Sequence, residues 1–361
     1  MLGQMKRRLL LWALAALPAG SGAQAAAIGP RPLVFPGDFG AHPEARTEWW
    51  YLTGALQAGE RLFGFQVTFF RSRTAVPAEH PSRFAARQLV FGHAALSEVG
   101  PARLRHDQRL ARAGFGIAQA AEADTRVSLR DWSLQREGPA DASRYRARVV
   151  SDNAGFRLDL ALATTQPLLL QGEAGLSRKG PRPEQASHYY SQPQLAASGT
   201  LTLDGRALAV QGRAWLDHEW SDTLLDPQAV GWDWIGMNLD DGSALTAFRL
   251  RRADGSTLFA GGSLRHPGQA ARSFRPDEVR FTPGRRWLSP ASQASYPVQW
   301  TIETPAGRHT VQALFDAQEL DSRASTGAYY WEGLSELHDT QGLRVGRGYL
   351  EMTGYAARLN L

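Results

Sequence analysis

Residues 63–69 read Phe-Gly-Phe-Gln-Val-Thr-Phe, and residues 156–162 read Phe-Arg-Leu-Asp-Leu-Ala-Leu. In both stretches a large apolar residue occupies every second position, with smaller or polar residues between. Successive side chains of a β-strand point to opposite faces, so this alternation predicts strands with one buried face. Asp-Gly pairs at 204–205, 241–242 and 254–255 indicate hairpins, because type I′ turns need residues that accept a positive φ. The pattern predicts an all-β fold of antiparallel strands, in a sandwich or a closed barrel.

The composition is that of a globular protein rich in aromatic residues and glycine. The chain has 361 residues, of which 43% are hydrophobic and 21% charged, with 11 Trp, 15 Phe, 9 Tyr, 36 Gly and no Cys. This length is enough for two domains, and a chain without Cys has neither disulfides nor a lipoprotein anchor. No run of 18 apolar residues occurs, so the sequence predicts no transmembrane segment.

The net charge of +5 does not indicate a nucleic-acid partner. Lys6, Arg7 and Arg8 precede the first acid of the chain, and without them the net charge is 5 − 3 = +2. The remaining basic residues are scattered among acids rather than gathered in a block. Binding to a nucleic-acid backbone needs a basic block or stripe, so we expect no nucleic-acid partner.

The N-terminal residues have the order of a secretory signal peptide. The basic cluster 6–8 is followed by the apolar run 9–17 and then by small residues that include Ala-Gln-Ala at 23–25. The apolar run is too short to cross a bilayer. The sequence therefore predicts a signal peptide over 1–27 and export to the periplasm, by the Sec route or, given Arg7-Arg8, by the twin-arginine route. The alternative is a buried N-terminal helix.

Four motifs recur in the same order in the two halves of the chain. The pairs are Trp49-x-Tyr51 with Trp232-x-Trp234, 91–100 with 259–268, Tyr189-Tyr190 with Tyr329-Tyr330, and 212–217 with 346–351. One such match carries little weight, whereas four in one order predict a duplicated domain. The polar, Pro-containing stretch 221–229 marks the boundary. We therefore expect an N-terminal barrel over 28–224 and a C-terminal barrel over 225–361.

Three motifs carry a resemblance to a known family. They are Thr-Glu-Trp-Trp-Tyr-Leu-Thr-Gly at 47–54, Trp-Leu-Asp-His-Glu-Trp at 215–220 and Gly-Trp-Asp-Trp at 231–234. The chain resembles the AttH-like family, which is related to the carotenoid 1,2-hydratases (CrtC, hydroxyneurosporene synthase). The resemblance implies two tandem lipocalin-like β-barrels. It also implies that the protein binds a lipophilic molecule (an isoprenoid, carotenoid or lipid) or adds water to an isoprenoid double bond. Many family members look exported and are associated with ABC-type transport operons, which implies an ABC transporter as a partner.

The acid-His-acid run at 217–219 is the candidate catalytic motif. On a strand, Asp217 and Glu219 share one face and His218 takes the other. Hydration of an alkene needs an acid that protonates the double bond, aromatic faces that stabilise the carbocation, and a water molecule. An apolar surrounding raises the pKa of a carboxyl group and keeps it protonated. We expect Asp217 to act as the acid or to support it, and His218 to position or relay the proton, with no metal and no organic cofactor.

An alternative for His218 is a structural role. The matching position of the second copy is Met352, so this face is apolar there, and a buried histidine needs only a hydrogen-bonding neighbour. A metal site is not expected, because alternation separates His218 from both acids and a closed zinc site needs about four converging ligands. The hydratases themselves read Asp-His-Asn at this run, whereas this chain has Glu219 in the third place.

Five aromatic residues are candidates for the ligand-binding lining. They are Trp50, Tyr189, Tyr190, Trp220 and Trp232. Most of them belong to the N-terminal half, where we expect the ligand site. The resulting prediction is an exported lipocalin-like protein that binds a lipophilic molecule and, if it is an enzyme, a hydro-lyase that adds water to a C=C bond. The alternative is a non-enzymatic envelope carrier or adaptor associated with an ABC-type exporter.

Overall fold

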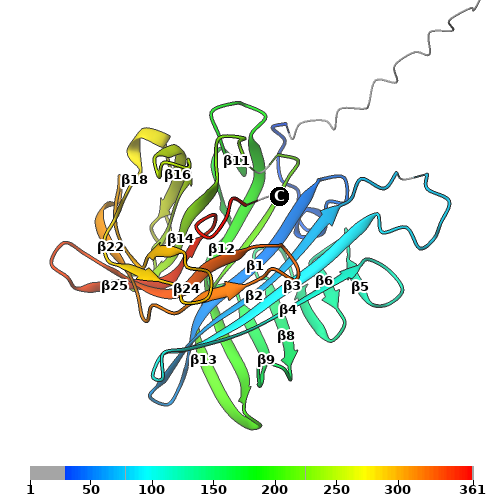
Figure 1. Ribbon diagram of the computed structural model, residues 1–361, viewed down its shortest axis with the longest axis horizontal. Coiled ribbons are helices and arrows are strands. Elements are labelled where there is room, and N and C mark those ends of the chain that lie inside the picture. Colours follow the sequence, from blue (N-terminus) through cyan, green and yellow to red (C-terminus); the bar gives the residue numbers. More distant parts are fainter. Residues whose placement is uncertain (1–28, 78, 224, 360–361) are drawn as a thin grey trace, which may run out of the picture.

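The computed structural model describes residues 29–77, 79–223 and 225–359, and throughout them the fold is all-β with antiparallel pairing (Figure 1). The fold prediction is therefore confirmed, while the predicted signal peptide over 1–27 lies outside the described residues. Within the described part of the chain, the helices are two short 3-10 turns, Gly37–Phe39 and Pro276–Glu278. No helix in these ranges is long and apolar enough to cross a membrane.

The first sheet, sheet A, is a nearly closed antiparallel barrel. Its strands follow the order β4-β3-β2-β1-β13-β12-β9-β8-β7-β6-β5, and β10 and β11 pair with β12. The strands at its two ends also approach each other, because β4 contacts β6. The bounds are β1 Thr47–Ala58, β2 Arg61–Arg73, β3 Gln88–Glu98, β4 Arg103–Arg112, β5 Ala118–Ala120, β6 Arg126–Leu129, β7 Trp132–Glu137, β8 Arg144–Ser151, β9 Phe156–Ala163, β10 Leu169–Leu170, β11 Leu176–Arg178, β12 Ala186–Leu203 and β13 Arg206–Ser221.

The second sheet, sheet B, repeats the central strand order of sheet A. Its order is β17-β16-β15-β14-β25-β24-β22-β21-β18, so that β16-β15-β14-β25-β24 matches β3-β2-β1-β13-β12. The domain division at 224/225 and the duplication themselves stay predictions. The bounds are β14 Gly231–Leu239, β15 Ala244–Arg251, β16 Thr257–Arg265, β17 Arg272–Phe274, β18 Arg280–Pro283, β21 Gln299–Thr304, β22 Gly307–Ala313, β23 Glu319–Asp321, which pairs with β24, β24 Tyr329–His338 and β25 Arg344–Met352. The strands β19 Arg286–Leu288 and β20 Ser295–Pro297 form a separate two-stranded sheet.

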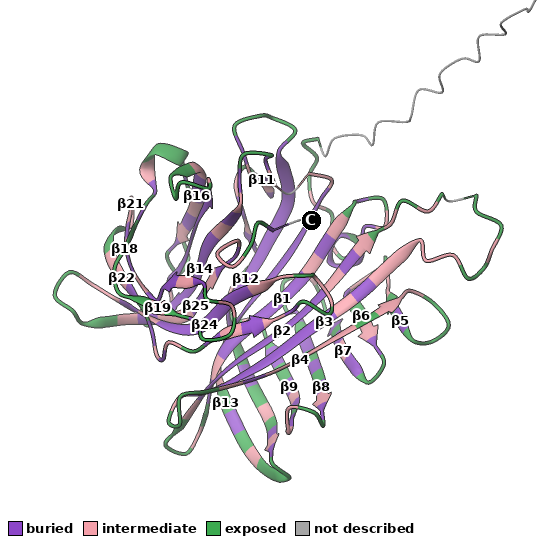
Figure 2. Ribbon diagram, in the orientation of Figure 1, coloured by how far each residue is buried: buried purple, intermediate pink, exposed green. Residues whose placement is uncertain are grey.

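The interior of sheet A is filled by its own side chains. The apolar residues that alternate along 63–69 and 156–162 are buried and belong to one hydrophobic cluster. The long central strands of both sheets are buried along much of their length (Figure 2). The period-2 pattern of the sequence therefore corresponds to inward-facing positions of a packed barrel.

The outer faces of the two sheets pack against each other. Tyr51 and Trp215 of sheet A form one cluster with Trp234 and Tyr349 of sheet B. Gly64 on β2 permits this approach, because a Cβ there would lie 2.6 Å from the Tyr349 hydroxyl oxygen and 2.9 Å from the Leu334 Cβ. Large aromatic side chains from the outer face of each sheet thus pack against each other between the sheets.

Gly64→Ala tests this packing. The added methyl group must displace side chains of sheet B in a closely packed contact, so we expect a loss of about 1–3 kcal/mol in the free energy of unfolding. Gly100→Ala is the matched control, because a Cβ at Gly100 meets nothing within 4 Å. Urea unfolding measures both variants. Equal stability of the two variants would contradict the close contact between the sheets.

Candidate functional site

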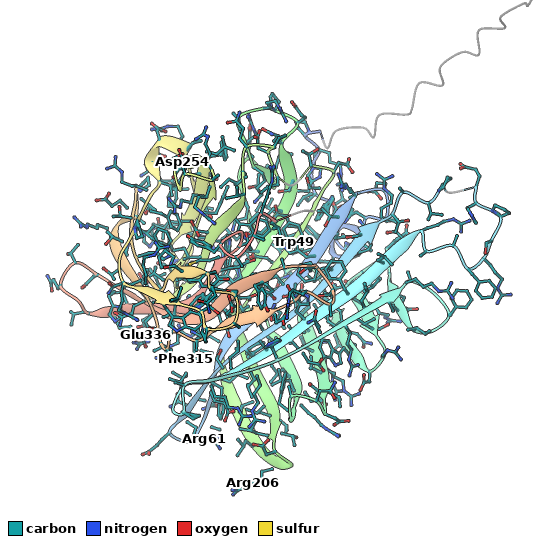
Figure 3. The ribbon with its side chains drawn as sticks, viewed as in Figure 1. Trp49, Arg61, Arg206, Asp254, Phe315 and Glu336 are labelled. Atoms are coloured by element: carbon teal, nitrogen blue, oxygen red, sulfur yellow. The ribbon has the colours of Figure 1, made fainter. Side chains whose placement is uncertain are left out.

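A cavity of about 400 Å³ lies between the two sheets and is lined by outward-facing residues of both. Trp49, labelled in Figure 3, marks the β1 side of this region. The aromatic lining is Trp49, Tyr51, Phe70, Phe91, Tyr189, Trp232, Trp234, Phe248 and Tyr330. Five carboxyl groups and one ammonium group also line it, namely Asp217, Glu219, Asp222, Glu332, Glu351 and Lys179. The cavity is therefore an apolar space with acidic groups set into its walls.

The two sheets place their acids at equivalent points. Asp217 on β13 lies opposite Tyr51 of β1 and Ser191 of β12. Glu351 on β25 lies opposite Trp234 of β14. On its other side Glu351 faces Glu332 of β24. The cavity thus receives one acid from each sheet at the corresponding strand and a further acid from sheet B.

The pKa of Asp217 lies near neutral pH. Burial raises its pKa to about 7, and the negative charge of Glu219 acts in the same direction. Ser191 Oγ donates to Asp217 Oδ1 at 2.5 Å, and Trp215 Nε1 donates to the same oxygen at 2.7 Å. These hydrogen bonds lower the pKa without cancelling the effect of burial. Asp217 is therefore a carboxyl group whose titration lies near physiological pH.

Glu332 and Glu351 are directly opposed acids on adjacent strands. Like charges at directly opposite positions of a sheet repel, which favours protonation of at least one of them. Glu332 is buried, whereas Glu351 keeps partial access from the cavity. Burial raises the pKa of Glu351 to about 8, helped by the charges of Asp217 and Glu219. Burial and the charge of Glu351 raise the pKa of Glu332 well above its usual value.

Three polar atoms of the cavity wall make no hydrogen bond of standard geometry among the described residues, although the Tyr51 hydroxyl lies near enough to the Glu332 carboxyl to oppose the rise of its pKa. They are Tyr51 Oη, Gln66 Oε1 and Glu332 Oε1, and each is buried. Buried polar groups are nearly always paired, since an unpaired one costs about 1–3 kcal/mol. Unpaired atoms that border a cavity are therefore candidates to bind a water molecule or a hydroxyl group of a ligand.

A chain of hydrogen bonds determines that the Tyr330 hydroxyl donates its proton to His93. Ser325 Oγ donates to Gln108 Oε1 at 2.6 Å, so it accepts from His93 Nε2 at 2.8 Å. His93 Nδ1 then accepts from the Tyr330 hydroxyl at 2.8 Å. Burial lowers the pKa of His93 to about 3, which keeps the ring neutral. Gln66 Nε2 donates to Tyr330 Oη at 3.3 Å, leaving Gln66 Oε1 as a pure acceptor.

Lys179 and Glu219 form an ion pair at one side of the cavity. Lys179 Nζ lies 3.0 Å from Glu219 Oε1, and the Ser187 hydroxyl donates to the same oxygen. The ammonium group also lies 4.6 Å from the ring centroids of both Tyr189 and Phe248. Lys179 thus supplies positive charge to this side of the cavity and connects the aromatic walls of the two sheets.

His218 points away from the cavity, into the interior of sheet A. His218 Nε2 lies 2.9 Å from Glu48 Oε1, and His218 Nδ1 lies 3.0 Å from Tyr190 Oη. The imidazole stacks on Trp50 at 4.6 Å between centroids and lies against Trp220. All four ring-bearing residues are buried. The alternation of strand β13 therefore places His218 on the opposite face from Asp217.

Glu48 is the centre of a buried charge network. Its Oε1 also lies 2.7 Å from His42 Nδ1, and Arg71 Nε donates to Oε2 at 2.7 Å. Burial works against ionisation of Glu48, but His218, His42 and Arg71 hold its pKa below the usual range. One ligand atom each from His42, Glu48 and His218 lie within 4.8 Å of one another. Each residue is already hydrogen-bonded and Arg71 adds positive charge, so the arrangement is that of an ion-pair network rather than a metal centre.

The predicted site residues separate into two groups. Asp217, Tyr189 and Trp232 line the cavity, and their roles stay predictions. The other four, His218, Trp50, Tyr190 and Trp220, lie together inside sheet A. The cavity is also lined by Lys179, Gln66, Tyr330, Glu332 and Glu351, none of which was predicted to be a site residue from the sequence. The sequence did contain a signal for Glu351, because the match of 212–217 with 346–351 aligns Glu351 with the candidate acid Asp217.

The fold and the cavity define a lipocalin-like, all-β protein. A family model described as AttH-like matches residues 26–355, and the chain belongs to this family. A crystal structure of an AttH-type protein from Nitrosomonas europaea is 47% identical, with a TM-score of 0.84 over 91% of this chain and 99% of that one. Kievitone hydratase from Nectria haematococca is 15% identical, with a TM-score of 0.67 over 92% and 95%. CghA is 16% identical, with a TM-score of 0.51 over 90% and 93%. A comparison with curated proteins finds no match.

Glu48→Gln tests the role of the charge network. Removing this charge leaves the buried Arg71 uncompensated, so we expect a loss of about 3–5 kcal/mol in the free energy of unfolding at neutral pH. Because the pKa of Glu48 is depressed in the folded state, its stabilisation is present above the unfolded pKa and disappears as the pH falls through the folded value. The difference between wild type and variant therefore shrinks in acid.

Urea unfolding across the acid range measures this difference. Glu60→Gln is the control, because Glu60 is exposed in the turn between β1 and β2. A Glu48→Gln protein as stable as the Glu60→Gln protein would contradict the network.

Proposed function

We propose that this protein binds a lipophilic molecule in the cavity between the sheets and adds water across a C=C bond of that molecule. One observation carries the proposal: Asp217, Glu332 and Glu351 hold raised pKa values against aromatic walls. A carboxylic acid that stays protonated near neutral pH is the donor that alkene protonation requires. The resemblance in fold to a hydratase is consistent with this chemistry.

The first step is proton transfer from a carboxylic acid to carbon. Asp217 or Glu351 donates its proton to one alkene carbon, so that a C–H bond forms, the π bond breaks and a carboxylate remains. The adjacent carbon becomes a tertiary carbocation. The faces of Trp49, Trp232 and Tyr189 present negative quadrupole charge, which stabilises a cation, and the new carboxylate adds its own charge.

The second step adds water. Gln66 Oε1 accepts a hydrogen bond from the water, and Tyr51 Oη and Glu332 Oε1 are the other unpaired atoms that hold it. The water oxygen attacks the carbocation, a C–O bond forms, and the surplus proton returns to the carboxylate. The acid is restored and the product is a tertiary alcohol. These two steps involve only the alkene, water and the chain's own side chains.

The volume of the cavity limits how much of a substrate it can enclose. A volume of about 400 Å³ lies within the range of small-molecule sites, and it suits one prenyl-like end of an isoprenoid, carotenoid or lipid. Arg46, Arg73 and Asp222 line it beside the aromatic walls and provide a polar boundary. We infer that the reacting end of the molecule enters the cavity and that its remainder lies toward this boundary.

Export belongs to the same proposal. The order of basic, apolar and small residues over 1–27 supports a signal peptide and a periplasmic location. The aromatic walls also suit a second candidate, a non-enzymatic envelope carrier that works with an ABC-type exporter. In that case the carboxyl groups bind the ligand without protonating it, and the ligand leaves the protein unchanged.

Hydration is tested with the protein lacking residues 1–27 and a terminal isoprenoid alkene in ¹⁸O-labelled water. We expect a product heavier by one labelled water, and a rate lower by about 10²-fold or more in Asp217→Asn and Glu351→Gln. The wild-type rate falls as the pH rises through about 7, because Asp217 loses its proton there. The exposed-site variant Glu60→Gln keeps the wild-type rate.

Mass spectrometry of the extracted lipid distinguishes the outcomes. Retained but unmodified alkene supports the carrier and overturns the hydratase. Labelled product at an equal rate in both acid variants contradicts the assignment of the acids.

A further inference from the structure

Exposed apolar side chains gather at one edge of sheet A. Seven large apolar residues are exposed in the described part of the chain, and four of them come from two neighbouring segments. These are Phe84, in the loop 74–87 between β2 and β3, and Leu110, Phe115 and Ile117, around the turn that joins β4 to β5. Phe84 is 62% exposed and Phe115 46% exposed. Figure 1 shows the β2–β3 loop projecting from the body of the molecule near β5.

The two exposed rings are held together by arginines. Phe84 and Phe115 stack with centroids 5.5 Å apart and planes 5° apart. The Arg112 guanidinium carbon lies 4.1 Å from the Phe115 centroid and 5.4 Å from that of Phe84. The Arg83 guanidinium carbon lies 5.4 Å and 5.7 Å from the Phe84 and Phe115 centroids. We call these four residues the Phe84–Phe115 patch.

The charge of this region is positive. Among the described residues, neither Arg83 nor Arg112 has a carboxylate oxygen within 4.0 Å, whereas Arg109 pairs with Asp131. The segments 79–87 and 109–117 together contain four arginines and one acid, Glu79, and with Asp131, the partner of Arg109, the net charge is 4 − 2 = +2. The patch therefore offers apolar rings and two guanidinium groups that form no ion pair within the described part of the chain, and Arg112 also donates to the Phe84 carbonyl oxygen at 3.0 Å.

We propose that the Phe84–Phe115 patch docks on the surface of an anionic phospholipid bilayer. Aromatic rings gain by entering the boundary between headgroups and acyl chains, and guanidinium groups gain by contact with lipid phosphates. Exposed apolar patches that are flanked by polar groups are typical of interaction sites. Two rings and a few charges give weak and reversible binding, as for other peripheral proteins with few anchoring groups.

Part of the Phe84–Phe115 patch lies on a loop that joins two strands of the cavity wall. The loop 74–87 follows Arg73 and precedes Phe91 in the chain, and both of these residues line the cavity. A bilayer bound at this loop lies beside one end of the strands that form the cavity wall. A lipophilic molecule would then have a short path between the membrane and the cavity. The docking proposal does not depend on hydration, because a carrier would need the same path.

Vesicle sedimentation tests the proposal with the protein lacking residues 1–27. Vesicles of phosphatidylcholine alone are compared with vesicles in which phosphatidylglycerol makes up about a third of the lipid. We expect binding to the anionic vesicles that weakens as salt is added. The double variant Phe84→Ser/Phe115→Ser lowers the partition coefficient by about tenfold or more. Arg83→Gln/Arg112→Gln retains the rings and loses the preference for anionic lipid.

A matched control and a folding check accompany the test. Leu288→Ser/Leu343→Ser removes two side chains that are equally exposed, at 61% each, on β19 and in the turn between β24 and β25, and it keeps wild-type binding. Urea unfolding of each variant shows whether the fold is intact. The proposal is overturned if wild type binds no vesicle, if the Phe variant binds as wild type does, or if the Phe variant only loses stability or self-association.

Discussion

Burial of carboxyl groups between two apolar faces is the constraint on which the rest of this site depends. An acid withdrawn from water favours its neutral form, and a second acid beside it strengthens that preference. Glu332 and Glu351 satisfy both conditions, since they stand opposite each other on adjacent strands beside the cavity. Asp217 satisfies the first condition and keeps hydrogen bonds that hold its carboxyl group in place. The pKa values of these carboxyl groups are therefore raised above those of exposed acids.

The architecture explains why these acids lie between the sheets. The inner faces of both sheets are covered by their own apolar side chains, so the cavity of about 400 Å³ arises where the outer faces of the sheets meet. Tyr51 and Trp234 occupy the same place beside Asp217 and Glu351 in the two sheets. Inside sheet A, the ionised Glu48 is compensated by His42, His218 and Arg71. Glu48 on β1 and Asp217 on the adjacent strand β13 thus lie on opposite faces of sheet A, the first ionised and paired, the second with a raised pKa.

Much of the fold could be predicted from local pattern, whereas the site could be predicted only in part. Alternation along 63–69 established the strands, and alternation along 217–219 separated Asp217 from His218. The expectation of a ligand site in the N-terminal half did not anticipate that Trp50 and Trp220 would fill that interior. Recognising Glu332 required the pairing register of β24 with β25, which depends on contacts distant in sequence. Gln66 and Tyr330 carry no local signal, because their importance lies in the unpaired oxygen and the His93 chain.

The central claim, that the cavity acids remain protonated near neutral pH, is tested most directly by infrared spectroscopy. The carbonyl stretch of a neutral carboxylic acid is distinct from the bands of a carboxylate, so a pH titration reports each acid in place. We expect a carboxylic acid band in the wild-type protein at pH 6 that weakens as the pH rises through about 7 and about 8, where Asp217 and Glu351 titrate, and that is smaller in Asp217→Asn and Glu351→Gln. A wild-type protein without that band at pH 6, or with a band unchanged in both variants, would contradict the account.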